Sequence, residues 1–137
     1  MKKNGILNSD ISRVLSYMGH TDRICIGDCG LPIPDETERI DLALRFGVPS
    51  FMEVLKEVAG DMKIEAIILA EEIKEQNPGQ LADILSFFEE TGTGCMPSVK
   101  FVSHAELKKM TEDCKAVIRT GEASPYSNII LQSDCIF

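Results

Sequence analysis

The sequence has no apolar run that approaches the ~20 residues needed to cross a bilayer. It opens with Met1-Lys2-Lys3-Asn4-Gly5, a basic start that is followed by neither a long apolar stretch nor a cleavage signal. This pattern argues against a secretory signal peptide. Nothing in these residues directs export, and we therefore expect a cytoplasmic protein.

Positive charge is also scarce. The 14 lysines and arginines face 22 aspartates and glutamates, which gives a formal net charge of −8. Phosphate contacts with nucleic acid require a basic stripe, and anionic membrane surfaces attract clustered lysine and arginine. The charge balance therefore argues against nucleic acid and against a membrane as partners.

Several signatures of specific chemistry are missing. The sequence has no C-x-x-C, and its cysteine count is odd, which argues against a disulfide framework and favours reduced thiols. The five cysteines are Cys25, Cys29, Cys95, Cys114 and Cys135. Cys25 and Cys29 lie close to His20 in the sequence but do not complete a zinc pattern, so we predict no metal site. A G-x-S-x-G elbow, a phosphate-cradling glycine loop and H-E-x-x-H are absent as well.

The patterns that are present indicate one α/β domain over residues 1–137. The 137 residues, 44% apolar and 26% charged, are ordinary for a single globular domain. Strands are expected over residues 23–27, 40–44, 64–70, 98–102, 115–119 and 128–132. Helices are expected to begin at Asn8 or Ser9, at Pro49 or Ser50, at Pro78 and at Ser103. Strands that alternate with helices predict a layered fold with a mostly parallel central sheet and helices on both faces.

Local signals add detail to this fold. Gly19 follows the first helical pattern and is expected to end that helix as its C′ residue. Ser103 and Glu106 have the spacing of a capping box. The nearly continuous apolar run over 64–70 is typical of a strand covered on both faces.

The loop after the first strand is a candidate site. It reads Asp28-Cys29-Gly30-Leu31-Pro32-Ile33-Pro34 and is rich in residues that break regular structure. Open α/β sheets bind ligands at loops beyond strand ends. Asp28 is either a turn-forming aspartate or a carboxylate that shares a site with a nearby histidine.

The two histidines, His20 and His104, each lie at a predicted helix boundary. Histidine is the side chain best suited to moving protons near pH 7, although a histidine can equally pack, cap a helix or face water. His20 is the stronger candidate, because Gly19 precedes it and Asp22 follows two residues later. An imidazole and the Asp28 carboxylate on adjacent loops would form one proton-transfer site.

Two further segments carry polar groups. Glu71 and Glu72 end the apolar run at 64–70, where they are either catalytic or, as we favour, the solvated start of a helix. The polar segment 119–128 is either a binding loop in which Tyr126 and Asn128 contact sugar hydroxyls, since Asn both donates and accepts, or, as composition alone favours, a connecting loop.

At these residues the sequence resembles the D-ribose pyranase family over nearly its whole length. The most specific blocks are Gly19-His20-Thr21-Asp22, Asp28-Cys29-Gly30-Leu31-Pro32-Ile33-Pro34, Arg39-Ile40-Asp41-Leu42-Ala43, Ala70-Glu71-Glu72-Ile73-Lys74, Ile118-Arg119-Thr120-Gly121-Glu122 and Ser124-Pro125-Tyr126-Ser127-Asn128-Ile129-Ile130-Leu131. Several blocks in one order are far more specific than any single short motif.

The resemblance implies an activity and a site. Members interconvert the pyranose and furanose forms of D-ribose and help to supply the furanose to ribokinase, with no metal or organic cofactor. The family's proton donor matches His20. Its sugar-binding positions match Asp28, His104, Tyr126, Ser127 and Asn128.

The resemblance also implies an assembly. The family forms ring-based homo-oligomers, often a decamer of two pentameric rings, with sites near subunit contacts. Tyr126 and Asn128 are therefore expected to serve the His20 of a neighbouring subunit.

Three alternatives remain at this point. L-fucose mutarotase shares the fold and the early Gly-His pair but lacks the Leu-Pro-Ile-Pro run seen at 31–34, so that run favours ribose. Cys29 stands where alanine is usual, and Ala123 where cysteine or threonine is more common, which bears on the preferred sugar. A non-enzymatic ribose-binding accessory protein and a purely structural ring protein are the other two alternatives.

Overall fold

The structure is a computed structural model that describes residues 1–91 and 96–137, so Cys95 lies outside the described residues. Its elements are α1 (Ser9–Tyr17), β1 (Arg23–Gly27), β2 (Arg39–Asp41), α2 (Phe51–Asp61), β3 (Ile64–Ala70), α3 (Ile73–Gln76), α4 (Pro78–Glu90), β4 (Ser98–Val102), α5 (His104–Met110), the 3₁₀ turn η1 (Thr111–Asp113), β5 (Val117–Arg119) and β6 (Ile129–Ser133). Within these residues, no helix is long and apolar enough to pass through a membrane.

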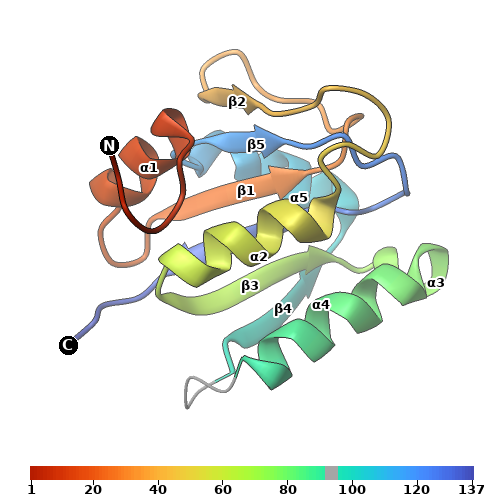
Figure 1. The fold of residues 1–137 in the computed structure, drawn as a ribbon. Coiled ribbons are helices and arrows are strands. Elements are labelled where there is room, and N and C mark those ends of the chain that lie inside the picture. The colour runs from red at the N-terminus through yellow and green to blue at the C-terminus, as the bar shows by residue number, and fades with distance from the viewer. Residues whose placement is uncertain (92–95) are drawn as a thin grey trace.

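The strands form a 6-stranded sheet in the order β2-β5-β1-β6-β3-β4. Figure 1 labels the other strands, while β6 passes behind α2. The β2–β5, β5–β1 and β3–β4 pairs are parallel, whereas β6 runs antiparallel to both β1 and β3. The prediction of a mostly parallel sheet is therefore confirmed. Since the other strands all run one way, their carboxyl ends meet at one edge of the sheet, the carboxyl edge, and β6 runs from that edge to the opposite one, the amino edge.

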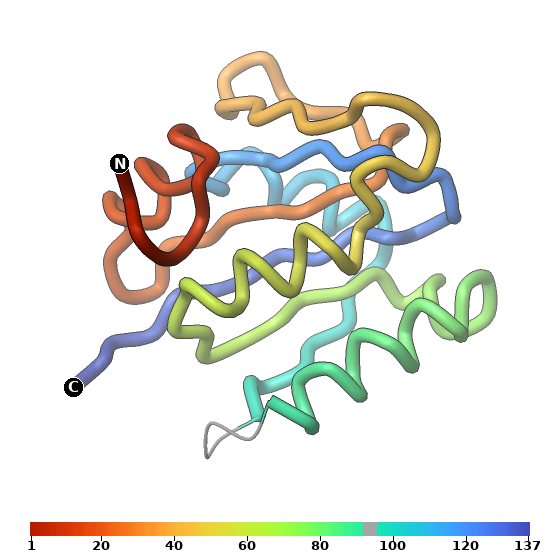
Figure 2. The backbone as a smooth tube through the Cα atoms, in the orientation of Figure 1, coloured from red at the N-terminus to blue at the C-terminus, as the bar shows by residue number. Residues whose placement is uncertain are grey.

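Helices cover both faces of the sheet, as predicted. Helices α1, α2 and α4 pack on one face and α5 with η1 on the other, an arrangement that can be followed in Figure 2. The period of two along β1 explains how one strand serves both layers. Ile24 and Ile26 join the core beneath α1 and α2, while Cys25 between them joins the core beneath α5.

Helix starts follow their local capping signals. The Asn8 side chain accepts a hydrogen bond from the Ile11 N–H at 2.9 Å, and Ser50 forms a full capping box at α2. Ser103 accepts from the Glu106 N–H, but no return bond from the Glu106 side chain is recorded in the described structure, so the predicted capping box is half formed. Gly19 follows the α1 C-cap as expected, yet its φ is not in the left-handed region.

Two strands are shorter than predicted. β2 ends at Asp41, because the Asp41 side chain accepts from the Ala43 N–H at 3.0 Å and turns the chain. β5 begins only at Val117. In β2, apolar periodicity continued past Asp41, where this local hydrogen bond turns the chain.

Candidate functional site

Asp28 and Asn128 meet at the carboxyl edge of the sheet. Asp28 directly follows β1, and Asn128 directly precedes β6. The buried Asn128 amide accepts from the Asp28 N–H at 2.9 Å and donates to Asp28 Oδ2 at 3.0 Å. Asp28 Oδ1 accepts from the Gly30 N–H at 2.9 Å. The carboxylate is thus held in one orientation, with a lone pair left on each oxygen for a ligand.

The close approach of Asn128 to β1 depends on Gly27. A Cβ at Gly27 would lie 3.1 Å from Asn128 Oδ1 and 2.7 Å from Leu31 Cδ2. Thr120 Oγ1 donates to the Gly27 carbonyl oxygen at 2.8 Å and ties the end of β5 to the same point. A glycine here therefore allows the amide of one strand to reach the carboxylate of the next.

His104 and Tyr126 lie against each other at the same edge. Their rings make an edge-to-face contact with centroids 5.0 Å apart and planes at 88°. Tyr126 has a φ of 57°, a left-handed conformation that is uncommon for a bulky residue and that sets the direction of its ring. Among the described residues, the buried His104 Nδ1 has no hydrogen-bond partner. This nitrogen is unpaired and shielded from solvent within one chain.

Burial lowers the pKa of His104 below its ordinary value of 6.5, and the Lys108 charge adds to the lowering. The Glu72 and Asp28 carboxylates oppose it without reversing it. His104 is therefore neutral near pH 7, when one ring nitrogen donates and the other accepts.

Glu72 holds the start of α5. Its two carboxylate oxygens accept from the His104 N–H at 3.1 and 2.9 Å. Hydrogen bonds from its own N–H and from the His104 N–H lower the pKa of Glu72. Glu71 instead pairs with Lys74 at 2.7 Å. The helix-start interpretation thus fits Glu71, but it missed that Glu72 positions His104.

Ser127 is fully buried, and its hydroxyl is engaged beneath the site. It lies 2.8 Å from Ser124 Oγ and accepts from Asn77 Nδ2 at 3.3 Å. Asn77 is the N-cap of α4, so these bonds fasten the segment before β6 to that helix. The Ser127 side chain therefore supports the loop that carries Tyr126 and Asn128.

A hollow of about 520 Å³ adjoins Tyr126 on the side of α3. This volume is within the range of small-molecule sites. Both polar and apolar residues line it: Glu71, Glu72, Lys74, Glu75, Gln76, Phe101, Val102, Ser103 and Tyr126. A polar ligand with one apolar face would fit such a lining.

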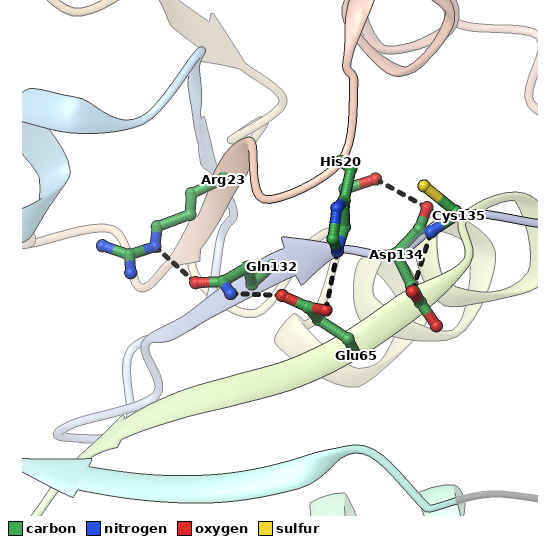
Figure 3. A network of polar contacts seen from close by, with 7 residues as sticks. His20, Arg23, Glu65, Gln132, Asp134 and Cys135 are labelled. Atoms are coloured by element: carbon green, nitrogen blue, oxygen red, sulfur yellow. Dashed lines mark hydrogen bonds and ion pairs between the residues drawn. The ribbon is translucent and has the colours of Figure 1, made fainter.

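His20 lies at the amino edge, between α1 and β1. Its half-exposed ring places Nε2 3.0 Å from Glu65 Oε2, and Figure 3 shows the contact. Asp22, the carboxylate singled out beside it in the sequence, accepts from the Gly19 N–H at 2.9 Å and pairs with Lys115 at 3.4 Å. Glu65 was missed, although a single charge inside the apolar run 64–70 was a usable signal.

The predicted residues thus fall into two groups within one chain. Asp28, His104, Tyr126 and Asn128 gather at the carboxyl edge, whereas His20 lies at the amino edge. β1 separates His20 from Asp28 along its whole length. One chain therefore does not form the shared His20–Asp28 site that adjacent loops suggested.

The described residues contain one cluster with metal-ligand atoms close together. His20, Glu65 and Asp134 offer atoms within 4.8 Å of one another. Hydrogen bonds from Gln132 and then from His20 lower the pKa of Glu65, so both of its oxygens already accept. Cys25 and Cys29 take no part in this cluster.

The family model described as RbsD / FucU transport protein family matches residues 1–136. A D-ribose pyranase from Streptococcus uberis is 56% identical over 133 residues, which are 97% of each chain. A D-ribose pyranase from Clostridium perfringens is 50% identical over 137 residues and 100% of both chains.

Solved structures have the same fold. The structure of Bacillus subtilis RbsD complexed with D-ribose superposes with a TM-score of 0.93 at 44% identity and covers 100% of both chains. The fucose mutarotase of Streptococcus pneumoniae in complex with L-fucose has a TM-score of 0.83 over 99% of this chain and 100% of that one. At 21% identity, this second likeness shows the fold alone.

Proposed function

This chain belongs to the RbsD / FucU transport protein family, and we propose that it acts as a D-ribose pyranase. It interconverts β-D-ribopyranose and β-D-ribofuranose by acid–base-assisted ring opening and closure. The observation that carries this function is full-length similarity, at 50% identity and above, to proteins named D-ribose pyranase. The likeness at 44% identity to an RbsD complexed with D-ribose supports it.

The reaction needs two proton transfers and a change of ring. The ring oxygen gains a proton, and the anomeric hydroxyl loses one, which opens the ring to the aldehyde. A different hydroxyl then closes on that aldehyde and changes the ring size. His20 is the proton donor in this proposal, because histidine is the side chain best suited to proton transfer and half of the His20 side chain is exposed.

The carboxyl edge binds the sugar. The two free lone pairs of Asp28 accept from ribose hydroxyls, and the partly exposed imidazole of His104 contacts a third. Tyr126 offers its ring and phenol, and Asn128 holds Asp28 in place. Ser127 contributes by fastening the loop beneath them.

A complete site requires two copies of the chain. His20 and Asp28 lie at opposite ends of β1, so the His20 that acts on a sugar comes from a neighbouring subunit. A homo-oligomer, proposed here as a decamer of two pentameric rings, brings the two edges together. The furanose passes to ribokinase in the cytoplasm, and no cofactor takes part.

Saturation-transfer NMR on D-ribose tests the function directly. The wild-type chain should speed exchange between pyranose and furanose signals, and His20→Ala should lower that rate about 10²-fold or more, the usual size of general acid–base catalysis. Far-ultraviolet circular dichroism and a urea titration check that the variant folds.

Three other outcomes of the NMR experiment would each contradict part of this proposal. Near-normal exchange in His20→Ala would remove His20 from the chemistry. Ribose binding without faster exchange would make the chain a binding protein. Faster anomer exchange on L-fucose than ring exchange on ribose would make it a fucose-type mutarotase.

A further inference from the structure

Glu65 reaches His20 because of an irregularity in β3. Ile64 pairs with Ser133 and Ala66 pairs with Gln132, so β3 carries an extra residue, Glu65, opposite one step of β6. Such bulges re-aim a side chain and occur often beside functional sites. The carboxylate consequently meets the side chains of Gln132 and His20.

A directional chain of hydrogen bonds runs through these side chains, as Figure 3 shows. Arg23 Nε donates to Gln132 Oε1 at 2.8 Å, and a guanidinium can only donate. The orientation of the buried Gln132 amide is therefore fixed, with Nε2 turned toward Glu65. Gln132 Nε2 donates to Glu65 Oε1, which leaves Glu65 Oε2 for His20 at 3.0 Å.

This direction decides which nitrogen of His20 carries the proton. An ionised carboxylate only accepts, so His20 must donate from Nε2. In the neutral imidazole, Nδ1 is then the nitrogen with the free lone pair. A carboxylate that fixes a histidine tautomer in this way is familiar from the catalytic triad of serine proteases.

We propose that Glu65 is a positioning residue, held by Gln132 and Arg23, which makes Nδ1 the nitrogen through which His20 exchanges protons with the sugar. Nδ1 accepts a proton when the anomeric hydroxyl loses one and returns it to the ring oxygen, so the imidazole ends unchanged. This role rests on the proposed function, in that it assigns the working nitrogen of the proposed acid–base group. The tautomer itself is a property of the free protein.

Glu65→Gln gives a sharp test, because Gln132 still donates toward residue 65. The new amide must turn its oxygen to Gln132 and its NH₂ to His20. His20 Nε2 then has to accept, and the proton moves to Nδ1. Long-range ¹H–¹⁵N NMR of the two histidines at about pH 9, where histidine is ordinarily neutral, should show the Nε2–H form in the wild type and the Nδ1–H form in the variant.

The double variant Glu65→Gln/Gln132→Glu should restore the original direction. The carboxylate introduced at position 132 accepts from Arg23 and from the amide at position 65, whose oxygen again faces His20. Ring exchange should fall about 10²-fold in Glu65→Gln and recover at least about 10-fold in the double variant, within the range of general acid–base catalysis. Glu57→Gln, an exposed change on α2, is the charge-matched control and should leave exchange unchanged.

The His20 tautomer and the ring-exchange rate together distinguish a failure of the positioning role from a failure of the pyranase function. An unchanged tautomer in Glu65→Gln, or normal exchange despite an inverted tautomer, would overturn the positioning role. The predicted tautomers in a wild-type chain that does not speed ribose exchange would refute the pyranase function and, with it, the role at the sugar. A misfolded Glu65→Gln would shift the test to the wild type, where an Nδ1–H form of His20 would overturn the proposal.

Discussion

At the scale of single residues, His104 is the clearest case of an environment that changes chemistry. Its backbone is bound by Glu72, its ring touches Tyr126, and its Nδ1 is buried without a partner among the described residues. Burial favours the neutral ring, and a neutral ring can accept a hydroxyl hydrogen bond. The arrangement therefore suits sugar binding near pH 7 better than proton donation.

This environment predicts a pH-dependent stability. The folded pKa of His104 lies below 6.5, so between the two values the unfolded chain binds more protons than the folded one. The contribution of His104 to the free energy of unfolding therefore rises with pH through that window and is lost as pH falls below about 6.5. Urea titrations at several pH values from about 5 to 7 measure the free energy of unfolding of the wild type and of His104→Ala. The wild-type value minus the variant value should increase as pH rises.

The control for this prediction is the variant itself, because carboxylates that titrate at lower pH are common to both proteins. A stability difference that shrinks as pH rises would mean that the folded protein prefers the charged imidazole. That result would contradict the assigned role of burial.

Single residues also show which parts of the candidate site could be predicted from the sequence. The histidines stood out because imidazole transfers protons near pH 7, and Asp28 because it follows the first predicted strand. Glu65 was not singled out, since apolar periodicity predicts a regular strand and carries no sign of a bulge. Glu72 does begin a helix, as the N-cap of α3, but its bond with the His104 N–H was not predicted because the two residues lie 32 positions apart.

At the scale of elements, the loop after β5 depends on one close backbone contact. A Cβ on Gly121 would lie 2.4 Å from the carbonyl oxygens of Arg45 and Val48. The Gly121 N–H also donates to the Pro49 carbonyl oxygen at 2.9 Å. The segment that leads to Tyr126 and Asn128 is thus docked on the loop before α2.

Two glycine substitutions should have opposite effects. Gly121→Ala should lower the free energy of unfolding by about 3 kcal/mol or more, because backbone on both sides cannot yield cheaply. Gly60→Ala should raise it by up to about 1 kcal/mol, since Gly60 lies in α2 and a Cβ there meets nothing within 4 Å. Urea titration measures both, and a mild effect of Gly121→Ala would contradict the close contact.

Elements differ in how well the sequence predicts them. The helix starts at Asn8, Ser50 and Pro78 were predicted because capping is a local interaction. The antiparallel direction of β6 was not, because apolar alternation is the same in both directions. The direction of β6 is known only from its pairing with β1 and β3 in the structure.

At the scale of the whole molecule, the two proposed half-sites lie apart, so the proposed activity depends on an assembly. A single chain carries its proposed acid–base group at the amino edge and its proposed sugar-binding groups at the carboxyl edge. Head-to-tail contacts that close into a ring pair unlike edges of neighbours. Each copy then gives one half-site and receives the other.

Mixing two inactive variants tests this arrangement. His20→Ala loses the acid–base half, and His104→Ala loses part of the binding half without breaking a recorded side-chain hydrogen bond in the described structure. Coexpressed in equal amounts, they should form assemblies in which about a quarter of the sites contain both intact halves. Saturation-transfer NMR at low ribose concentration should show exchange well above that of either variant alone.

The matched control is a mixture of the same two proteins purified separately and combined without subunit exchange. Exchange in the coexpressed sample that only equals this control would mean that each site is built within one chain. Such a result would contradict the two-subunit site.

Strand β6 begins beside Asn128, in the proposed sugar-binding half-site, and ends beside the His20 network. At ~3.4 Å per residue, its 5 residues span about 17 Å. In the proposed assembly every copy contains this strand, so the length of β6 sets the distance between the two half-sites that each copy presents to its neighbours. Inserting one residue into β6 would lengthen this distance by ~3.4 Å and exchange the faces of the side chains beyond it, so all sites of the proposed ring would be misaligned together.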